Sequence, residues 1–198
     1  MWVKIVRVGI DVYRFMAKND YGQIQIYTGG GKGKTTAALG LAIRAVGGGK
    51  RVAIIYFDKG GSFYGERKIL RQILRGKIDY FVTGKVRFNR TTRKFRFGVE
   101  KGDIKEAKRG LVLAKKLIES GAYQLLILDE VNSTVSLGML DVAEVLEFMK
   151  SKPPKVELVM TGRNCPSEFI EQADLVTEMN LVKHYFYKGV PARRGIEY

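Results

Sequence analysis

At residues 27–36 the chain reads YTGGGKGKTT, a glycine-rich stretch between two different patterns. Apolar residues precede it over 23–27, and a helical pattern follows it over 36–46. A strand, a glycine-rich turn and a helix start, in that order, form an anion cradle, because the turn amides and the helix dipole point at one place. Lys34 adds a positive charge to that place, and the hydroxyl of Thr35 can hold a magnesium ion. The stretch therefore predicts a phosphate-binding loop.

This loop departs from the usual spacing, G-x-x-x-x-G-K-[ST], at its first position, where Thr28 stands in place of glycine. Two interpretations follow from the residues alone. The loop is either a nucleotide site with one altered position, or a variant that holds the phosphates in a different pose. Which of the two applies decides the chemistry of the protein.

The rest of the chain alternates short apolar runs with longer helical ones. Nearly continuous apolar runs are typical of parallel strands that are covered on both faces. This pattern predicts one α/β domain over 23–198, a doubly wound and mainly parallel sheet with helices on both faces. The expected strands are 23–28, 51–58, 79–83, 124–129, 155–161 and 175–179.

Two helix starts carry the signature of a capping box, an acid followed three residues later by a glutamate. Asp103 and Glu106 predict one helix start, with Gly121 ending that helix, and Asp141 and Glu144 predict another. Two segments fall outside the alternation of strands and helices. Residues 1–22 are an extension, an edge strand or a cover over a substrate, and 85–97 is a β-hairpin with aromatic and basic residues.

Composition narrows the class of protein. The chain has 198 residues, a formal net charge of +15 and one cysteine, Cys165. A single cysteine excludes an intrachain disulfide and favours a cytoplasmic location, and no apolar run is long enough to span a membrane. The basic charge has three open explanations: a polyanionic partner, the charged surface of a thermophile, or substrates that are themselves strongly negative. Charge without a nucleic-acid-binding module is weak support for the first, and we expect no nucleic-acid or membrane partner.

Several polar residues follow predicted strands and belong at the ligand edge of the sheet. Asp129 and Glu130 end an apolar strand, and carboxylates beside a phosphate loop are natural partners for magnesium. Arg163 follows another strand, where an arginine suits a phosphate or a carboxylate. Arg44 lies on the helix after the loop and either reaches a ligand or extends from the helix surface. His184, the only histidine, has no partners at metal-ligand spacing.

The motifs, taken together, resemble those of one family, the ATP:corrinoid adenosyltransferases of the P-loop type. The resemblance follows the family's order from about residue 23 to the end of the chain. It rests on TGGGKGKTT at 28–36, FDKG at 57–60, LDE at 128–130, TGR at 161–163, ADLVTEM at 173–179 and GVPARRGIEY at 189–198.

This resemblance implies transfer of the 5′-deoxyadenosyl group of ATP to the reduced cobalt of a corrinoid such as cob(I)alamin, with release of triphosphate. It implies a P-loop NTPase (RecA-like) fold in which ATP lies reversed, with Mg²⁺ or Mn²⁺ as cofactor. It also implies a homodimer and a flavodoxin-like reductant. The residues it assigns are Lys34, Thr35 and Glu130 for catalysis; Gly29, Gly30, Gly31, Lys32, Gly33, Lys34, Thr35, Thr36, Arg44 and Arg163 for ATP; and Thr35, Asp129 and Glu130 for the metal.

Two positions depart from the family pattern. Gly30 stands where relatives often have an asparagine, and residues 85–88 read KVRF where many members carry Phe and Trp at the corrinoid. Two other functions compete with the transferase. A RecA-like ATPase stimulated by nucleic acid fits the basic charge and the hairpin, and a phosphate-loop kinase fits the loop. The closing motifs favour the transferase over both.

Overall fold

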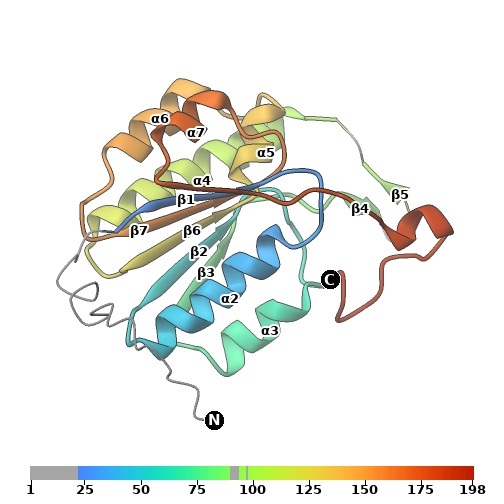
Figure 1. The fold of residues 1–198 in the computed structure, drawn as a ribbon, viewed down its shortest axis with the longest axis horizontal. Helices are drawn as coiled ribbons and strands as arrows, with labels where there is room; N and C mark the ends of the chain where they lie inside the picture. Colours follow the sequence, from blue (N-terminus) through green and yellow to red (C-terminus); the bar gives the residue numbers. More distant parts are fainter. Residues whose placement is uncertain (1–21, 90–93, 97) are drawn as a thin grey trace, which may run out of the picture.

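The computed structural model describes residues 22–89, 94–96 and 98–198, and within them a single parallel sheet forms the centre of the fold (Figure 1). Its strand order is β3–β2–β6–β7–β1–β8. Every strand expected from the sequence is confirmed, within two residues at each end. The strands are β1 (Ile24–Thr28), β2 (Val52–Tyr56), β3 (Ile78–Val82), β6 (Leu125–Asp129), β7 (Glu157–Thr161) and β8 (Leu175–Glu178).

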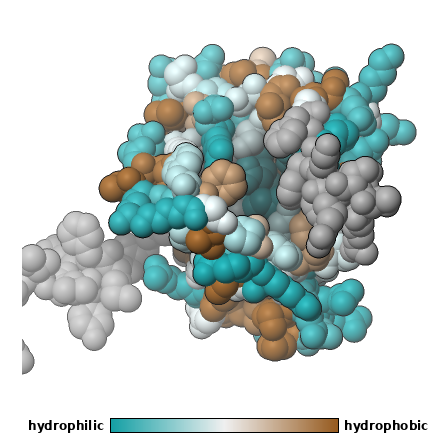
Figure 2. Space-filling view, turned by 90° about the vertical axis from the view of Figure 1, so that its right-hand side faces the viewer, coloured by the Kyte–Doolittle hydropathy of each residue, from teal (hydrophilic) through white to brown (hydrophobic). Residues whose placement is uncertain are grey.

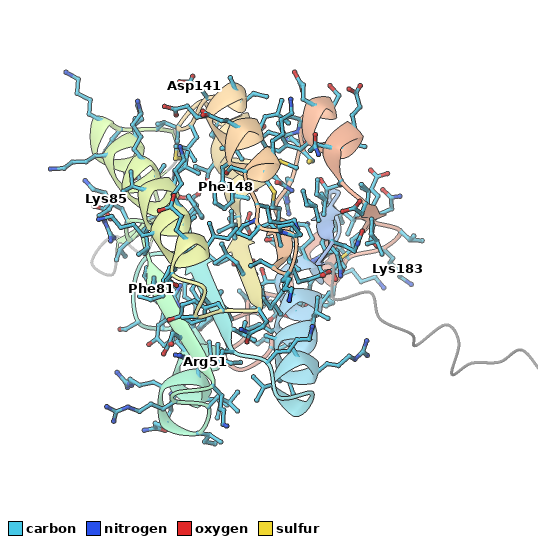
Figure 3. The ribbon with its side chains drawn as sticks, turned by 90° about the vertical axis from the view of Figure 1, so that its left-hand side faces the viewer. Arg51, Phe81, Lys85, Asp141, Phe148 and Lys183 are labelled. Atoms are coloured by element: carbon cyan, nitrogen blue, oxygen red, sulfur yellow. The ribbon has the colours of Figure 1, made fainter. Side chains whose placement is uncertain are left out.

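Helices cover both faces of this sheet, as the sequence predicts. One face packs against α2 (Lys34–Gly47) and α3 (Gly65–Gln72). The other packs against α4 (Lys101–Glu119), α5 (Val131–Ser136), α6 (Val142–Lys150) and α7 (Ser167–Gln172). A short 3₁₀ helix, η1 (Tyr185–Lys188), lies near the end of the chain. The helices lie above and below the edge-on sheet in Figure 3.

Two separate apolar clusters explain why the strands read as continuous apolar runs. Successive residues of a strand point to opposite faces, and both faces of β2 are buried: Ala53 and Ile55 belong to the cluster under α4, whereas Ile54 and Tyr56 belong to the cluster under α2 and α3. Phe148, labelled in Figure 3, comes from α6 and is fully buried in the first cluster. A polar residue at any of these positions would therefore be buried against a helix.

The start of α4 corrects one prediction. The helix begins at Lys101, and its capping box joins Glu100 to Asp103 instead of Asp103 to Glu106. The Asp103 carboxylate accepts a hydrogen bond from the Glu100 amide at 2.9 Å and pairs with Arg96 at 2.7 Å, so it serves the third helical position and not the cap. Glu106 instead pairs with Arg109 at 2.7 Å. The predicted end is confirmed, because Gly121 adopts φ 65° directly after the helix.

The second predicted cap, Asp141, does lie at the N-cap of α6. Its side chain makes no capping hydrogen bond within the described part of the chain. The helix therefore starts after an N-cap residue with extended backbone (φ −77°, ψ 140°) and no side-chain cap. The sequence signature located the helix start correctly but implied hydrogen bonds that the structure lacks.

The expected hairpin at 85–97 is present as β4 (Phe88–Asn89) and β5 (Lys94–Phe95), antiparallel, with Phe88 opposite Phe95. Its base is fixed by Arg87, whose Nε donates to Asp58 at 2.7 Å. Burial raises the pKa of Asp58, and the Arg87 pair opposes that rise. The prediction for residues 1–22 lies outside the described residues, except for Gly22.

Across the described ranges, no helix is both long and apolar enough to cross a membrane.

Candidate functional site

The ends of four strands meet at one edge of the sheet and surround a cavity of about 1090 Å³. Because all strands are parallel, the residues that follow β1, β2, β6 and β7 lie on the same side. The face turned toward the viewer in Figure 2 is hollowed near its centre, with hydrophilic residues in the hollow. From the predicted site, the lining includes Gly30, Gly31, Lys32, Gly33, Lys34, Thr35, Thr36, Glu130 and Arg163.

The glycine-rich loop packs tightly against the residues that follow β8. The Gly31 amide donates to the Met179 carbonyl at 2.6 Å. A Cβ added at Gly31 would lie 2.7 Å from that same carbonyl oxygen, whereas a Cβ at Gly30 would meet nothing within 4 Å. The loop therefore requires glycine at 31 for close backbone approach and tolerates a side chain at 30.

This contrast gives a matched pair of substitutions. Gly31→Ala forces backbone against backbone, and we expect it to displace the loop and weaken ATP binding by at least about tenfold, the cost of one misplaced set of amide donors. Gly30→Ala should stay within about twofold of the unmodified protein, since open space receives the methyl group. Isothermal titration with MgATP measures both. Equal losses in the two variants would contradict the packing described here.

Lys34, the predicted catalytic lysine, is buried at the first position of α2. Its Nζ donates to the carbonyls of Gly29 and Gly31, each at 2.7 Å. Burial lowers the pKa of this ammonium, and the nearby Glu130 carboxylate opposes that shift. The positive charge is thus fixed at the centre of the loop, against the wall of the cavity.

Asp129 is the centre of a hydrogen-bond network at the end of β6 and is 1% exposed. Its Oδ1 accepts from the Thr35 hydroxyl at 2.9 Å and from the Thr161 hydroxyl at 2.7 Å. Its Oδ2 accepts from the Lys59 ammonium at 2.7 Å. The structure thus places Asp129 beside Thr35 of the phosphate loop, where the sequence predicted that this acid would lie.

Glu130 is turned toward the cavity by an unusual backbone. It has φ 66°, a left-handed conformation that non-glycine residues seldom adopt and that occurs most often at functional sites. The Ser133 hydroxyl donates to Glu130 Oε2 at 2.7 Å and accepts from the Arg163 amide at 2.9 Å. Ser133 therefore ties the ends of β6 and β7 together, and Arg163 lies on the same cavity wall as Glu130.

Lys59 was not among the predicted site residues, although it directly follows the expected strand 51–58. Its Nζ contacts Asp129 Oδ2 at 2.7 Å, Glu130 Oε1 at 3.4 Å and the Thr35 hydroxyl. Burial lowers the pKa of Lys59, but the two carboxylates outweigh it, so the pKa is raised overall. The FDKG motif was the available sequence signal, and only the fold shows which oxygens the lysine meets.

Arg44 does not come into this cavity. It lies in the last turn of α2, exposed, and does not belong to the cavity lining. Three turns of helix separate it from Lys34, about 15 Å at 1.5 Å per residue. His184 does line the cavity, and its Nδ1 accepts a hydrogen bond from the Phe186 amide at 3.0 Å.

The last residues of the chain form a wall of the cavity that the sequence did not predict. Lys32 Nζ donates to Glu197 Oε1 at 2.8 Å, to the Ile196 carbonyl at 3.1 Å and to the Tyr185 hydroxyl at 3.2 Å. Arg193 also pairs with Glu197, at 3.1 Å. Lys32 thus connects the phosphate loop to this C-terminal wall, residues 185–198.

The charge of Glu197 depends on these donors. Its hydrogen bonds from Arg193, then Lys32, hold its pKa well below the ordinary value. Because the pKa of Glu197 is lower in the folded protein, its hydrogen bonds stabilise the fold fully above the ordinary pKa of a glutamate. This stabilisation is lost only as the pH falls through the lowered pKa. The wall should therefore remain attached throughout the range of about pH 6 to 8.

Glu197→Gln should weaken MgATP binding only modestly. The pairs that Glu197 makes with Lys32 and Arg193 are partly exposed to solvent, and such pairs contribute at most about 1 kcal/mol, which is about fivefold in affinity. Titration with MgATP tests this, with Glu171→Gln on the exposed side of α7 as the control. A loss of a hundredfold would mean that the wall is part of the binding site proper.

Comparison with known proteins decides the family. The model of the family described as "ATP:corrinoid adenosyltransferase BtuR/CobO/CobP" matches residues 20–198. The chain belongs to the ATP:corrinoid adenosyltransferase family. This confirms the resemblance seen in the motifs, and with it the enzyme class: an enzyme that transfers an adenosyl group from ATP to a corrinoid.

Curated relatives support the assignment over most of the chain. The chain is 35% identical to a corrinoid adenosyltransferase of Sinorhizobium sp, over 91% of this chain and 82% of that protein. It is 34% identical to the corrinoid adenosyltransferase of Pseudomonas aeruginosa, covering 92% and 86%. It is also 34% identical to that of Escherichia coli K12, covering 98% and 94%.

Similar solved structures confirm the fold class, and at their low sequence identity they show nothing beyond it. The flagellar accessory protein FlaH of Methanocaldococcus jannaschii has a TM-score of 0.52 at 14% identity, covering 80% of this chain and 71% of that one. A KaiC-like protein of Pyrococcus horikoshii has a TM-score of 0.53 at 16% identity, covering 83% and 75%. The predicted P-loop, RecA-like α/β fold is therefore confirmed.

Proposed function

We propose that this member of the family binds the triphosphate of ATP in the loop over 29–36 and presents the ribose 5′-carbon to the cobalt of a doubly reduced corrinoid. Cobalt attacks that carbon, the bond to the α-phosphate oxygen breaks, and its electron pair leaves with triphosphate. The observation that carries the proposal is the single cavity wall that combines the loop amides, Lys34 and Glu130. A leaving group with several negative charges needs donors such as the amides and Lys34 along its length. The Glu130 carboxylate would instead help to hold the cation that neutralises part of this charge.

Little acid–base chemistry is required of the protein, because the reduced cobalt is already a strong nucleophile. The protein's part is in-line placement of the two substrates and stabilisation of the departing triphosphate. We assign the second task to Lys34 and the amides of the loop. Arg163, on the same wall, is our candidate for a contact with the nucleotide. Arg44 lies outside the cavity lining, so we assign it no contact.

A hydroxyl in the first turn of α2 and two carboxylates at the end of β6 fit a magnesium ion. Thr35, Asp129 and Glu130 offer a hydroxyl and two carboxylates, the hard oxygen donors that Mg²⁺ prefers. Within the described ranges no cluster of three or more His, Cys, Asp or Glu side chains forms a metal cage. Mg²⁺ usually binds in this way, through one or two carboxylates together with substrate phosphates and water. When bound, the ion would neutralise charge on the triphosphate; Mn²⁺ would serve equally.

The product assay tests the function directly. Incubation with ATP, Mg²⁺ and chemically reduced cobalamin should yield a light-sensitive cobalt–carbon product and intact triphosphate in equal amounts. A RecA-like ATPase would instead yield ADP and phosphate, at a rate raised by single-stranded DNA, and a kinase would yield ADP and a phosphorylated acceptor. ADP as the main product, without the cobalt–carbon compound, would reject the proposal.

Further properties belong to the same proposal. We propose a homodimer, a flavodoxin-like protein as the source of electrons, and a cytoplasmic location, which suits a chain with one cysteine. We propose that residues 23–198 are the catalytic domain and that 1–22 cover the corrinoid. Analytical ultracentrifugation tests the first, and deletion of 1–22 followed by corrinoid titration tests the last.

A further inference from the structure

Lys59 holds the same oxygens that the proposed function assigns to magnesium. Its ammonium lies 2.7 Å from Asp129 Oδ2 and 3.4 Å from Glu130 Oε1, and it donates to the Thr35 hydroxyl. These are one hydroxyl and two carboxylates, the whole proposed metal set. The lysine side chain is 16% exposed, so this is a largely desolvated contact.

A divalent ion and this ammonium exclude each other. Mg²⁺ binds oxygen at about 2.0–2.1 Å, so an ion on Asp129 and Thr35 would lie within a few ångströms of the Lys59 nitrogen. Two cations at that separation repel strongly, because little water lies between them to screen the charges. Direct binding of the ion therefore requires the ammonium to leave.

The ammonium can leave without movement of the main chain. Arg67 is 4% exposed, and its guanidinium lies between the rings of Tyr56 and Tyr64, 4.5 Å from each centroid. From there it donates to the carbonyls of Lys59 and Gly61. The backbone of the 59–61 turn is thus fixed, and only the lysine side chain is left to rotate.

The cavity supplies the place to which the ammonium would move. Lys59 lines it together with Gly33, Lys34 and Thr35, the residues that we assign to the triphosphate. A lysine on this wall needs only a change of rotamer to exchange the carboxylates for phosphate oxygens.

We propose that Lys59 is an internal counter-ion that occupies the metal-binding oxygens and is transferred to the polyphosphate when the nucleotide binds. Metal binding then depends on the nucleotide: the ion alone meets a competitor, whereas ATP draws that competitor away. The inference rests on the proposed function for the identity of the metal ligands and of the anion. Lys59 would then be a positioning residue, which neither the loop motif nor the two carboxylates identify by themselves.

Metal and nucleotide are titrated separately, without corrinoid and therefore without turnover. Mn²⁺ alone is titrated by electron paramagnetic resonance, and metal-free ATP by calorimetry in EDTA. In Lys59→Met we expect Mn²⁺ to bind at least about tenfold more tightly than in the unmodified protein, because the ammonium that repels the ion is gone. Metal-free ATP should bind at least about tenfold more weakly, because the same ammonium attracts the polyphosphate. Lys59→Gln, whose amide can still donate to Asp129, should shift both affinities in the same directions.

Three controls make the result specific. Lys68→Met removes an equal charge from the exposed side of α3 and should change neither affinity. Lys59→Arg keeps the charge and should leave both near the unmodified values. Adding Asp129→Asn to Lys59→Met should abolish the gain in Mn²⁺ affinity, which places the ion at this carboxylate.

Unchanged Mn²⁺ affinity in both Lys59→Met and Lys59→Gln would overturn the proposal and leave Lys59 a fixed ion pair. Tighter Mn²⁺ binding with unchanged metal-free ATP binding would overturn the transfer to the polyphosphate. Neither titration depends on a corrinoid. A protein that makes no cobalt–carbon product but shows these shifts would therefore refute the proposed function while keeping the counter-ion.

Discussion

Replacing Lys34 by alanine should slow adenosyl transfer by a hundredfold to a thousandfold, about the loss that follows removal of one preorganised donor from a transition state. The ammonium is buried at the start of α2 and held by two loop carbonyls at 2.7 Å. Its charge is therefore already in place when the triphosphate departs, and water cannot replace it with the same geometry. Single-turnover formation of the cobalt–carbon product, at saturating ATP, measures the effect.

The folding of this variant must also be checked, because the Lys34 ammonium donates hydrogen bonds to two carbonyls of the loop. Loss of two hydrogen bonds at the cavity wall should cost about 1–2 kcal/mol of unfolding free energy, which leaves the protein folded. Lys68→Ala, on the exposed side of α3, is the matched loss of one lysine and should keep full activity. A folded Lys34→Ala protein with near-normal turnover would show that the triphosphate binds elsewhere.

Asp129→Asn should have the second large effect, on stability as well as on turnover. The carboxylate is 1% exposed and accepts from Thr35, Thr161 and Lys59. Neutralising it leaves the Lys59 ammonium without its nearest carboxylate, and breaking a buried pair in this way costs about 3–5 kcal/mol. Because Lys59 keeps some exposure to solvent, we expect a loss of about 3 kcal/mol in urea unfolding. We also expect at least a hundredfold loss of turnover, because the ion that would neutralise the leaving group loses one of its proposed carboxylate ligands.

A double variant separates the two consequences. Adding Lys59→Met to Asp129→Asn removes the unpaired charge, so it should restore part of the lost stability without restoring turnover. The coupling between the two positions in unfolding free energy then measures the pair itself. Additive losses in the double variant would mean that the ion pair contributes nothing to stability.

Local order along the chain was predictable where one physical pattern dominated. The apolar runs of β2 and β6 are buried on both faces, so they show no alternation and read plainly as parallel strands. The phosphate loop was equally predictable, because glycine, lysine and threonine at this spacing are seldom found in other structures. The start of α4 was misplaced by about one turn, since two acids at capping distance occur twice in succession. The hydrogen bond from the Glu100 amide to Asp103 identifies the first pair as the cap.

The fold class, the phosphate loop and the acids that follow β6 could be predicted from the amino-acid sequence, because each depends on residues that are neighbours in the chain. Which distant groups share the site is known only from the fold. It brings Lys59 onto Asp129, places Glu197 on Lys32 and leaves Arg44 outside the cavity. These pairings depend on strand order, which sets which loops meet at the carboxyl edge of the sheet, and no local pattern encodes that order.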